Sequence, residues 1–240
     1  MREFFQRVED GVSVNIEVDM NAYAYSKKYL WLFSIFVKFD ADENESDAYE
    51  EFLEMKESLI IALQHEEKAK FVGMRVVDGW SEFYFYAEDS KGLESSVTEI
   101  LKANEYVYES SVVKDNKWDF HHKNLTPTEL ELAHIQSEKI IFLLKEEDDD
   151  LEVVRAVEHY VSFLTPTQKN RFLNTLELDG VSFKDEIESD EFEHGVALVK
   201  EHALTSDEVR KVVDEIFEAT KKEEGFYEGW STVLASELVE

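Results

Sequence analysis

Histidine and carboxylate side chains are the groups in this chain whose types and spacing could support chemistry. His159 lies beside Glu158 in a run expected to form a strand, and His194 and His202 lie at or near the strand expected to pair with it. Imidazole and carboxylate groups bind divalent metals, so these residues suggest a cross-strand cluster. Metal ligands must converge on one point, however, and the spacing does not require this. We therefore favour a half-buried His159 bonded to a backbone carbonyl, and we expect no metal or cofactor.

Two further groups offer weaker metal sites. Asp40 and Asp42, with Glu51, match oxygen-ligand positions of a calcium-binding loop, but Glu45 replaces the glycine that the sharp turn of that loop needs. An acidic helix N-terminus explains these residues better. His121 is followed by another histidine, and adjacent residues of a strand point to opposite faces, which favours two linker histidines over a metal site.

Motifs of known enzyme classes are missing from the sequence. The chain has no cysteine, which excludes disulfides, thiolate nucleophiles and cysteine-based metal sites. It also lacks the G-x-S-x-G, Walker A, G-x-G-x-x-G and H-E-x-x-H patterns. These absences favour a protein that is not an enzyme.

The formal net charge of −30 is the strongest compositional signal. Such a field repels phosphate backbones and anionic lipids, so we expect neither direct nucleic-acid binding nor membrane binding. It would attract a basic segment of a protein partner, although an acidic surface also serves solubility. The N-terminus lacks the apolar region of a signal peptide, and the longest apolar run, residues 29–37, is too short to span a bilayer. We expect a cytoplasmic protein, and the sequence does not set its oligomeric state.

Hydrophobic periodicity predicts the order β-α-β-β-α-β in each half of the chain. In the first half, an alternating run at 12–18 precedes this series and can extend the sheet. The elements expected there are strands at 29–39, 71–77, 83–86 and 106–113, helices at 45–67 and 90–103, and an extended tail at 118–122. The second half is expected to have strands at 153–164, 181–187, 195–204 and 226–234, helices at 165–178 and 205–222, and an extra helix at 127–145.

The extra helix begins with a predicted capping box formed by Thr126 and Glu129, with Pro127 at the first helical position. The acidic run 146–150 that follows it is expected to be a solvated connector. In a β-α-β-β-α-β unit both helices lie on one face of an antiparallel sheet, so the extra helix is available to cover the other face. The predicted fold class is α+β, with two tandem ferredoxin-like (βαββαβ) α/β sandwiches in domains 1–124 and 125–240.

Three segments of the second half, 157–160 (VEHY), 179–181 (DGV) and 227–232 (YEGWST), stand out together. Their order and spacing resemble the regulator of ribonuclease E activity B (RraB) family. In the first half, segments 82–86 (EFYFY), 115–118 (DNKW) and 125–128 (LTPT) resemble a domain of unknown function, DUF695. The two resemblances together cover nearly the whole chain.

The RraB resemblance implies a ferredoxin-like domain and a protein that inhibits a ribonuclease by binding its non-catalytic scaffold, which alters RNA turnover. It implies no catalytic residues. We therefore predict a non-enzymatic regulatory or adaptor protein that acts by protein–protein contact. The candidate partner is a basic segment of a ribonuclease. The candidate partner-binding residues are His159, Tyr227, Gly229 and Trp230. The alternative is a metal- or small-ligand-binding enzyme that uses a cleft between the two halves.

Overall fold

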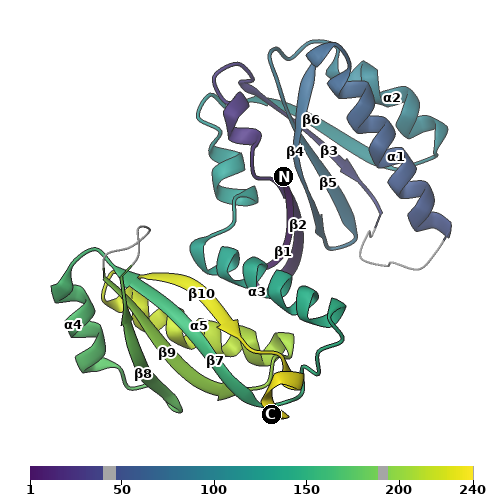
Figure 1. The fold of residues 1–240 in the computed structure, drawn as a ribbon. Helices are drawn as coiled ribbons and strands as arrows, with labels where there is room; N and C mark the ends of the chain where they lie inside the picture. Colours follow the sequence, from purple (N-terminus) through teal and green to yellow (C-terminus); the bar gives the residue numbers. More distant parts are fainter. Residues whose placement is uncertain (40–46, 189–193, 240) are drawn as a thin grey trace. The chain divides into compact units, whose positions relative to one another are not determined.

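The computed structural model describes residues 1–39, 47–188 and 194–239, and the chain divides into two compact units, Met1–Thr126 and Pro127–Glu240. Each unit combines one antiparallel sheet with helices (Figure 1). The predicted α+β class with antiparallel sheets is therefore confirmed. Within the described ranges, no helix is both long enough and apolar enough to cross a membrane.

The N-terminal unit has a six-stranded sheet in the order β1-β2-β4-β5-β3-β6. The run at 12–18 forms β2 beside β4, so it extends the sheet as predicted. Asp78 and Gly79 make the tight turn between β4 and β5, with positive φ angles of 50° and 75°. Strand β1 was not predicted, and its apolar residues are largely exposed, Phe4 at 67%. The elements are β1 (Arg2–Glu9), β2 (Val12–Asp19), η1 (Ala22–Tyr25), β3 (Trp31–Val37), α1 (Asp47–Gln64), η2 (His65–Glu67), β4 (Ala69–Val77), β5 (Trp80–Ala87), α2 (Leu93–Ala103), β6 (Tyr108–Lys114) and η3 (His121–Leu125).

Each face of this sheet has its own core. Helices α1 and α2 bury apolar residues such as Phe52 and Val97 against Phe33 and Phe85. On the other face, Trp118 and Leu125 pack with residues of β2, β4 and β5. The sheet is therefore buried on both sides, which explains the apolar character of its central strands.

The prediction of an extended tail at 118–122 is wrong, because residues 119–125 are helical and end in the π-helical turn η3. Asp115 causes the turn into this segment: its carboxylate accepts hydrogen bonds from the backbone N–H groups of Asp119 and Phe120, both at 3.0 Å. Trp118 takes a positive φ of 57°, which its fully buried ring stabilises by stacking on Tyr86 with centroids 3.8 Å apart.

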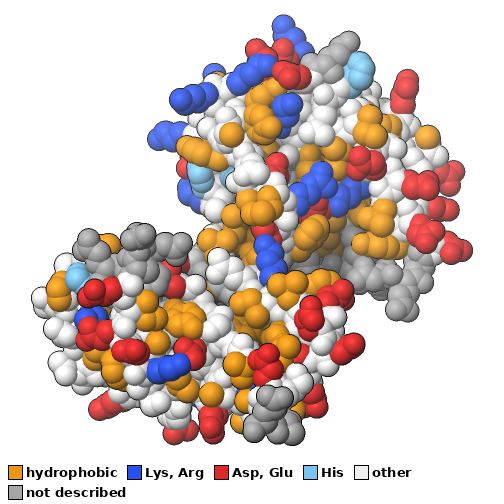
Figure 2. All heavy atoms as spheres, in the orientation of Figure 1, with side chains coloured by type: hydrophobic (Ala, Val, Ile, Leu, Met, Phe, Trp, Pro, Cys, Tyr) orange, Lys and Arg blue, Asp and Glu red, His pale blue; other side chains and the backbone are white. Residues whose placement is uncertain are grey.

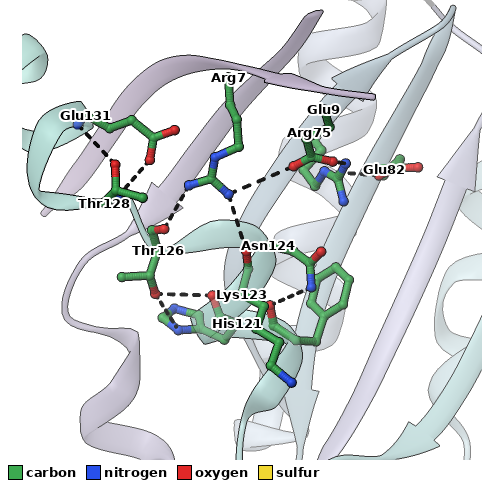
Figure 3. A network of polar contacts seen from close by, with 11 residues as sticks. Arg7, Glu9, Arg75, Glu82, His121, Lys123, Asn124, Thr126, Thr128 and Glu131 are labelled. Carbon is green, nitrogen blue, oxygen red and sulfur yellow. Dashed lines mark hydrogen bonds and ion pairs between the residues drawn. The ribbon is translucent and has the colours of Figure 1, made fainter. Parts of the chain in front are cut away.

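A polar network links β1 to η3 (Figure 3). The Arg7 guanidinium donates to the carbonyl oxygens of Lys123 at 3.3 Å and Thr126 at 3.0 Å. These are among the carbonyls that the end of a helical segment leaves without a partner inside the segment. Arg7 therefore stabilises the end of η3 from a distant strand.

The C-terminal unit has a four-stranded sheet in the order β10-β7-β9-β8. After α3, its elements follow the predicted β-α-β-β-α-β order. They are α3 (Glu129–Glu146), β7 (Arg155–Phe163), α4 (Pro166–Thr175), β8 (Val181–Ile187), β9 (His194–His202), α5 (Ser206–Lys222), β10 (Phe226–Thr232) and η4 (Ala235–Val239).

All three α-helices of this unit pack on the same face of the sheet. Val157 and Val161 lie on β7, two residues before and two residues after His159. Val157 belongs to a core with residues of α3 and α5, and Val161 belongs to a core with residues of α4 and α5. Successive strand residues alternate between faces, so these odd-numbered residues share one side. The prediction that the extra helix covers the other face is therefore wrong, and in the described part of this unit that second face has no helix on it.

The capping box of α3 lies two residues later than predicted. Thr128 accepts from the Glu131 N–H at 3.2 Å, and Glu131 accepts from the Thr128 N–H at 2.7 Å (Figure 3). Thr126 instead donates its hydroxyl to the His121 carbonyl at 3.1 Å. Both threonines fit the capping pattern in sequence, and the contact with η3 decides between them.

The acidic run after α3 is only partly a solvated connector. Asp149 pairs with Arg155 through both guanidinium nitrogens, and the two side chains are 1% and 0% exposed. Asp149 also accepts from the backbone N–H of Ala235 at 2.8 Å. The hydrogen bonds from Arg155 outweigh burial and lower the pKa of Asp149, so this aspartate is a charged structural group that holds the end of the chain.

Candidate functional site

The candidate site of the C-terminal unit begins with a buried chain of hydrogen bonds centred on His159. Strand β7 directs His159 to the helix-covered face, where its side chain is fully buried. His159 Nδ1 lies 2.9 Å from the Tyr227 hydroxyl, and His159 Nε2 lies 3.2 Å from His202 Nε2. His202 Nδ1 lies 2.7 Å from the carbonyl oxygen of Ala203.

The direction of these hydrogen bonds follows from their last member. The Ala203 carbonyl only accepts, so His202 carries its proton on Nδ1 and, as a neutral ring, accepts at Nε2. His159 must then donate from Nε2 and accept at Nδ1 from the Tyr227 hydroxyl. Every member is satisfied only when both rings are neutral.

The electrostatics of the site agree with neutral rings. Burial, together with the neighbouring His202 and Lys200, lowers the pKa of His159 to about 3. Burial also lowers the pKa of His202, against the opposing effect of its bond to Ala203. Burial raises the pKa of the Tyr227 hydroxyl, which keeps it protonated as the donor. The chain of bonds is therefore uncharged at neutral pH.

Strand β10 supplies the other candidate residues. Its pairing with β7 shifts between Tyr227 and Gly229, and Gly229 has a φ of +122°, a conformation that favours glycine. Beyond this bulge, Trp230 is 5% exposed and donates its indole N–H to the Ser137 hydroxyl at 2.9 Å. Trp230 therefore attaches β10 to α3.

A groove runs between α3 and β10, and we call it the α3–β10 groove. It consists of two neighbouring hollows of about 270 and 340 Å³ that share Ala133, Gln136 and Glu228. Trp230 and Tyr227 form part of its floor, and Glu129 and Glu228 give it acidic groups. The remaining lining residues are Leu132, Ser137, Lys139, Ile140, Tyr160, Phe217, Phe226 and Gly229.

The arrangement places two neutral imidazoles in contact beneath the groove. Two imidazoles face each other, but no group of three His, Asp or Glu residues in a metal-binding arrangement occurs in the described ranges 1–39, 47–188 and 194–239. The paired histidines are separated from solvent, His159 at 0% and His202 at 4% exposure. Their hydrogen bonds instead position Tyr227 and hence the floor of the groove.

The structure brings together only some of the predicted site residues. His159, Tyr227, Gly229 and Trp230 lie around the bulge in the middle of the β7–β10 pair, although the buried His159 reaches the groove only through Tyr227. The expectation of a half-buried His159 bonded to a backbone carbonyl is wrong, because its ring is fully buried and bonds to the side chains of Tyr227 and His202. His202 joins them, as a cross-strand cluster would require. Glu158 does not, because it lies on the opposite face and pairs with Lys184. His194 lies at the far end of β9, where it pairs in register with Phe163.

The remaining metal candidates lie elsewhere. His121 is in the N-terminal unit, where burial, followed by the nearby His122, lowers its pKa to about 4. Asp40 and Asp42 lie outside the described residues. Sequence reasoning missed Ser137 and Gln136, which face β10 from α3, because helical periodicity identified only the apolar residues of that stripe.

The segments that stood out in the first half are structural. Asp115 accepts from the Tyr86 hydroxyl at 2.6 Å as well as from the start of the 119–125 helical segment. Trp118 donates its indole N–H to the Tyr29 carbonyl at 2.7 Å. These contacts hold the cover of one sheet face in place, so the aromatic and acidic residues of segments 82–86 and 115–118 serve the core.

Comparison with known proteins gives two family matches. Residues 2–126 match the model of a family of unknown function (DUF695), and residues 134–232 match the model described as Regulator of ribonuclease activity B. Neither the curated proteins nor the solved structures give a match. The first match spans the N-terminal unit, and the second begins within α3 and ends with β10. The chain thus belongs to the DUF695 family and joins that domain to a C-terminal domain of the Regulator of ribonuclease activity B type.

Proposed function

We propose that this protein is a non-enzymatic regulator of a ribonuclease that acts by binding the ribonuclease through its C-terminal domain. The observation that carries the proposal is the match of residues 134–232 to the Regulator of ribonuclease activity B model. The β-α-β-β-α-β order and the strand order β10-β7-β9-β8 support a ferredoxin-like assignment for this domain. The division of the chain at Thr126 and Pro127 supports two domains at 1–124 and 125–240.

The proposed binding surface is the α3–β10 groove. Tyr227, Gly229 and Trp230 contribute to it directly, and His159 positions Tyr227 from below. Tyrosine and tryptophan are frequent hot-spot residues of interfaces, and an apolar floor with a polar rim is typical of such surfaces. The bulge at Gly229 leaves open space where a side chain would stand, since no atom lies within 4 Å of the position that a Cβ would take there.

The proposed partner segment is basic. Residues 124–240 contain 29 acidic and 11 basic residues, a net charge of −18, and Glu129 and Glu228 lie in the groove itself. An Arg- or Lys-rich segment that binds RNA in a ribonuclease would be attracted by this field and would lose its RNA contacts when bound. Direct competition by the acidic chain for RNA is disfavoured by the same charge.

A binding assay with purified proteins tests the proposal. The full chain is titrated into the ribonuclease of the same organism, and both affinity and cleavage of an RNA substrate are followed at two salt concentrations. We expect binding that weakens with salt and slows cleavage. Glu228→Lys should weaken binding by roughly five- to tenfold, which corresponds to about 1 kcal/mol or slightly more.

Glu177→Lys provides the matched control, because it makes the same charge change at an exposed residue after α4, outside the groove. It should leave affinity within about twofold of the unmodified chain, as expected for a charge remote from the contact. Equal losses in both variants would contradict the groove as the contact surface. Absence of binding together with unchanged RNA cleavage would contradict the regulatory function itself.

A further inference from the structure

We propose that the N-terminal domain binds a small organic monoanion, a carboxylate with a hydrocarbon body, in a cavity between helix α1 and strands β1, β2 and β4. The cavity has a volume of about 390 Å³, within the range of small-molecule sites. The proposal concerns the part of the chain whose family has no known function, and it does not depend on the proposed regulation of a ribonuclease.

The walls of the cavity are mostly apolar. Helix α1 contributes Phe52 and Leu53, β1 contributes Phe4, and β4 contributes Met74. Phe4 is 67% exposed and Leu53 is 40% exposed, so apolar surface at this cavity remains in contact with water in the free protein. A hydrocarbon ligand would cover it, with the favourable free energy of removing apolar area from water. Phe5, Asn15, Ile16, Tyr49 and Val76 complete the apolar and amide lining.

A compact charged group lies within this apolar lining. The Glu17 carboxylate, whose side chain is 4% exposed, pairs with Lys56 through one oxygen and with Arg2 through the other, the latter at 3.1 Å. Glu17 and Lys56 both line the cavity, and the Lys56 side chain is only 14% exposed. Figure 2 shows basic side chains set among hydrophobic ones on the part of this unit between the N-terminal strands and α1.

The charge of this group selects the ligand. Lys56 and Arg2 share the single Glu17 carboxylate, which leaves one positive charge in excess. Lys56 lines the cavity, where apolar walls weaken screening, whereas Arg2 lies beside the lining with 43% of its side chain exposed. A bound monoanion would bring the group to neutrality, whereas an ammonium ligand would raise the excess to two charges. The other acidic residues of α1, such as Glu54 and Glu57, are exposed to water, where their effect is screened. The site is therefore locally cationic in a protein of net charge −30.

Lys56 is the group expected to hold the ligand carboxylate. It has three N–H donors, and its pairing with Glu17 uses one of them. A carboxylate entering the cavity would accept a second, and the Asn15 amide is available as a neighbouring polar group in the same lining. The cavity is at the small end of the usual range, and a ligand with a chain of about eight carbons is small enough to enter it.

Methyl NMR of the full chain tests the proposal, with three probes that each have eight carbons and carry a negative, neutral or positive head group: octanoate, 1-octanol and octylammonium. The sequence has four methionines, of which Met74 lines the cavity and Met20 does not. We expect octanoate to shift the Met74 methyl resonance, leave Met20 unchanged, and bind about tenfold or more tightly than octanol, the usual gain from a charge-assisted hydrogen bond. Octylammonium should bind most weakly.

Two variants separate charge from apolar contact. Lys56→Met should reduce the affinity for octanoate to that for octanol, whereas Lys102→Met, at an exposed position of α2, should have no effect. Leu53→Trp fills the cavity from a partly exposed position, so it should weaken the binding of octanoate and of octanol. If Lys56→Met does not fold, the ratio of octanoate to octanol affinities in the unmodified chain still decides the question. Equal binding of the three probes, or no response of Met74 to octanoate, would overturn the proposal.

Discussion

Acidification is expected to destabilise the C-terminal unit through His159. The folded protein holds this imidazole neutral, with a pKa lowered to about 3, whereas the unfolded chain titrates near 6.5. The unfolded state therefore binds more protons below pH 6.5, and stability falls as the pH drops from 6.5 towards 3. The loss is about 1.4 kcal/mol per pH unit, or roughly 2 kcal/mol at pH 5 from this residue alone.

The structure gives the reason for this cost. A proton added to the His159–His202 pair would place hydrogens on both facing Nε2 atoms, 3.2 Å apart, or would force His159 to lose the hydrogen bond it accepts from Tyr227. A loss of about 2 kcal/mol is a large share of the stability of an ordinary domain. His202, whose pKa burial also lowers, adds to the effect in the same direction.

The assay is urea denaturation of the unmodified chain and of His159→Phe between pH 7 and pH 5, with the histidines of the N-terminal unit common to both. His159→Phe should be less stable at pH 7, by roughly 1–3 kcal/mol, because Tyr227 and His202 lose their shared partner. It should nevertheless lose about 2 kcal/mol less than the unmodified chain on going to pH 5. His194→Gln, at a half-buried position far along β9, is the matched control and should follow the unmodified chain. An identical pH dependence in His159→Phe would refute the reasoning.

Two further predictions concern local structure. Thr128→Ala should lower stability by about 1 kcal/mol in urea denaturation, because it removes the hydroxyl that caps the Glu131 N–H, and an unchanged midpoint would show that the capping box contributes nothing. Gly73→Ala should cost roughly 1–3 kcal/mol, because its Cβ would lie 2.5 Å from the backbone oxygen of Glu17 in the neighbouring strand. Full stability of Gly73→Ala would mean that β2 can move away from β4 without cost.

The periodicity of the sequence was sufficient to predict most elements of both units. All nine predicted strands lie close to observed ones, because a run that must bury one or both faces shows its period in its composition. Of the ten strands in the described residues, only β1 was not predicted. Periodicity did not reveal β1, because Phe4 stays exposed and the more buried side of this strand consists mostly of charged residues such as Glu3 and Arg7. The pairing of β1 with β2 supplies what the pattern lacks.

The sequence by itself determined the α+β character, the two-part organisation and the resemblance of the second half to the Regulator of ribonuclease activity B family. Only the tertiary structure decided that His159 meets His202, 43 residues away, that Lys56 meets Glu17, 39 residues away, and that α3 lies on the same face as α4 and α5. The physical reason is that local periodicity reports which side of an element is buried. Which elements meet there depends on the free energy of the whole packed unit, to which contacts distant in sequence contribute as much as local ones.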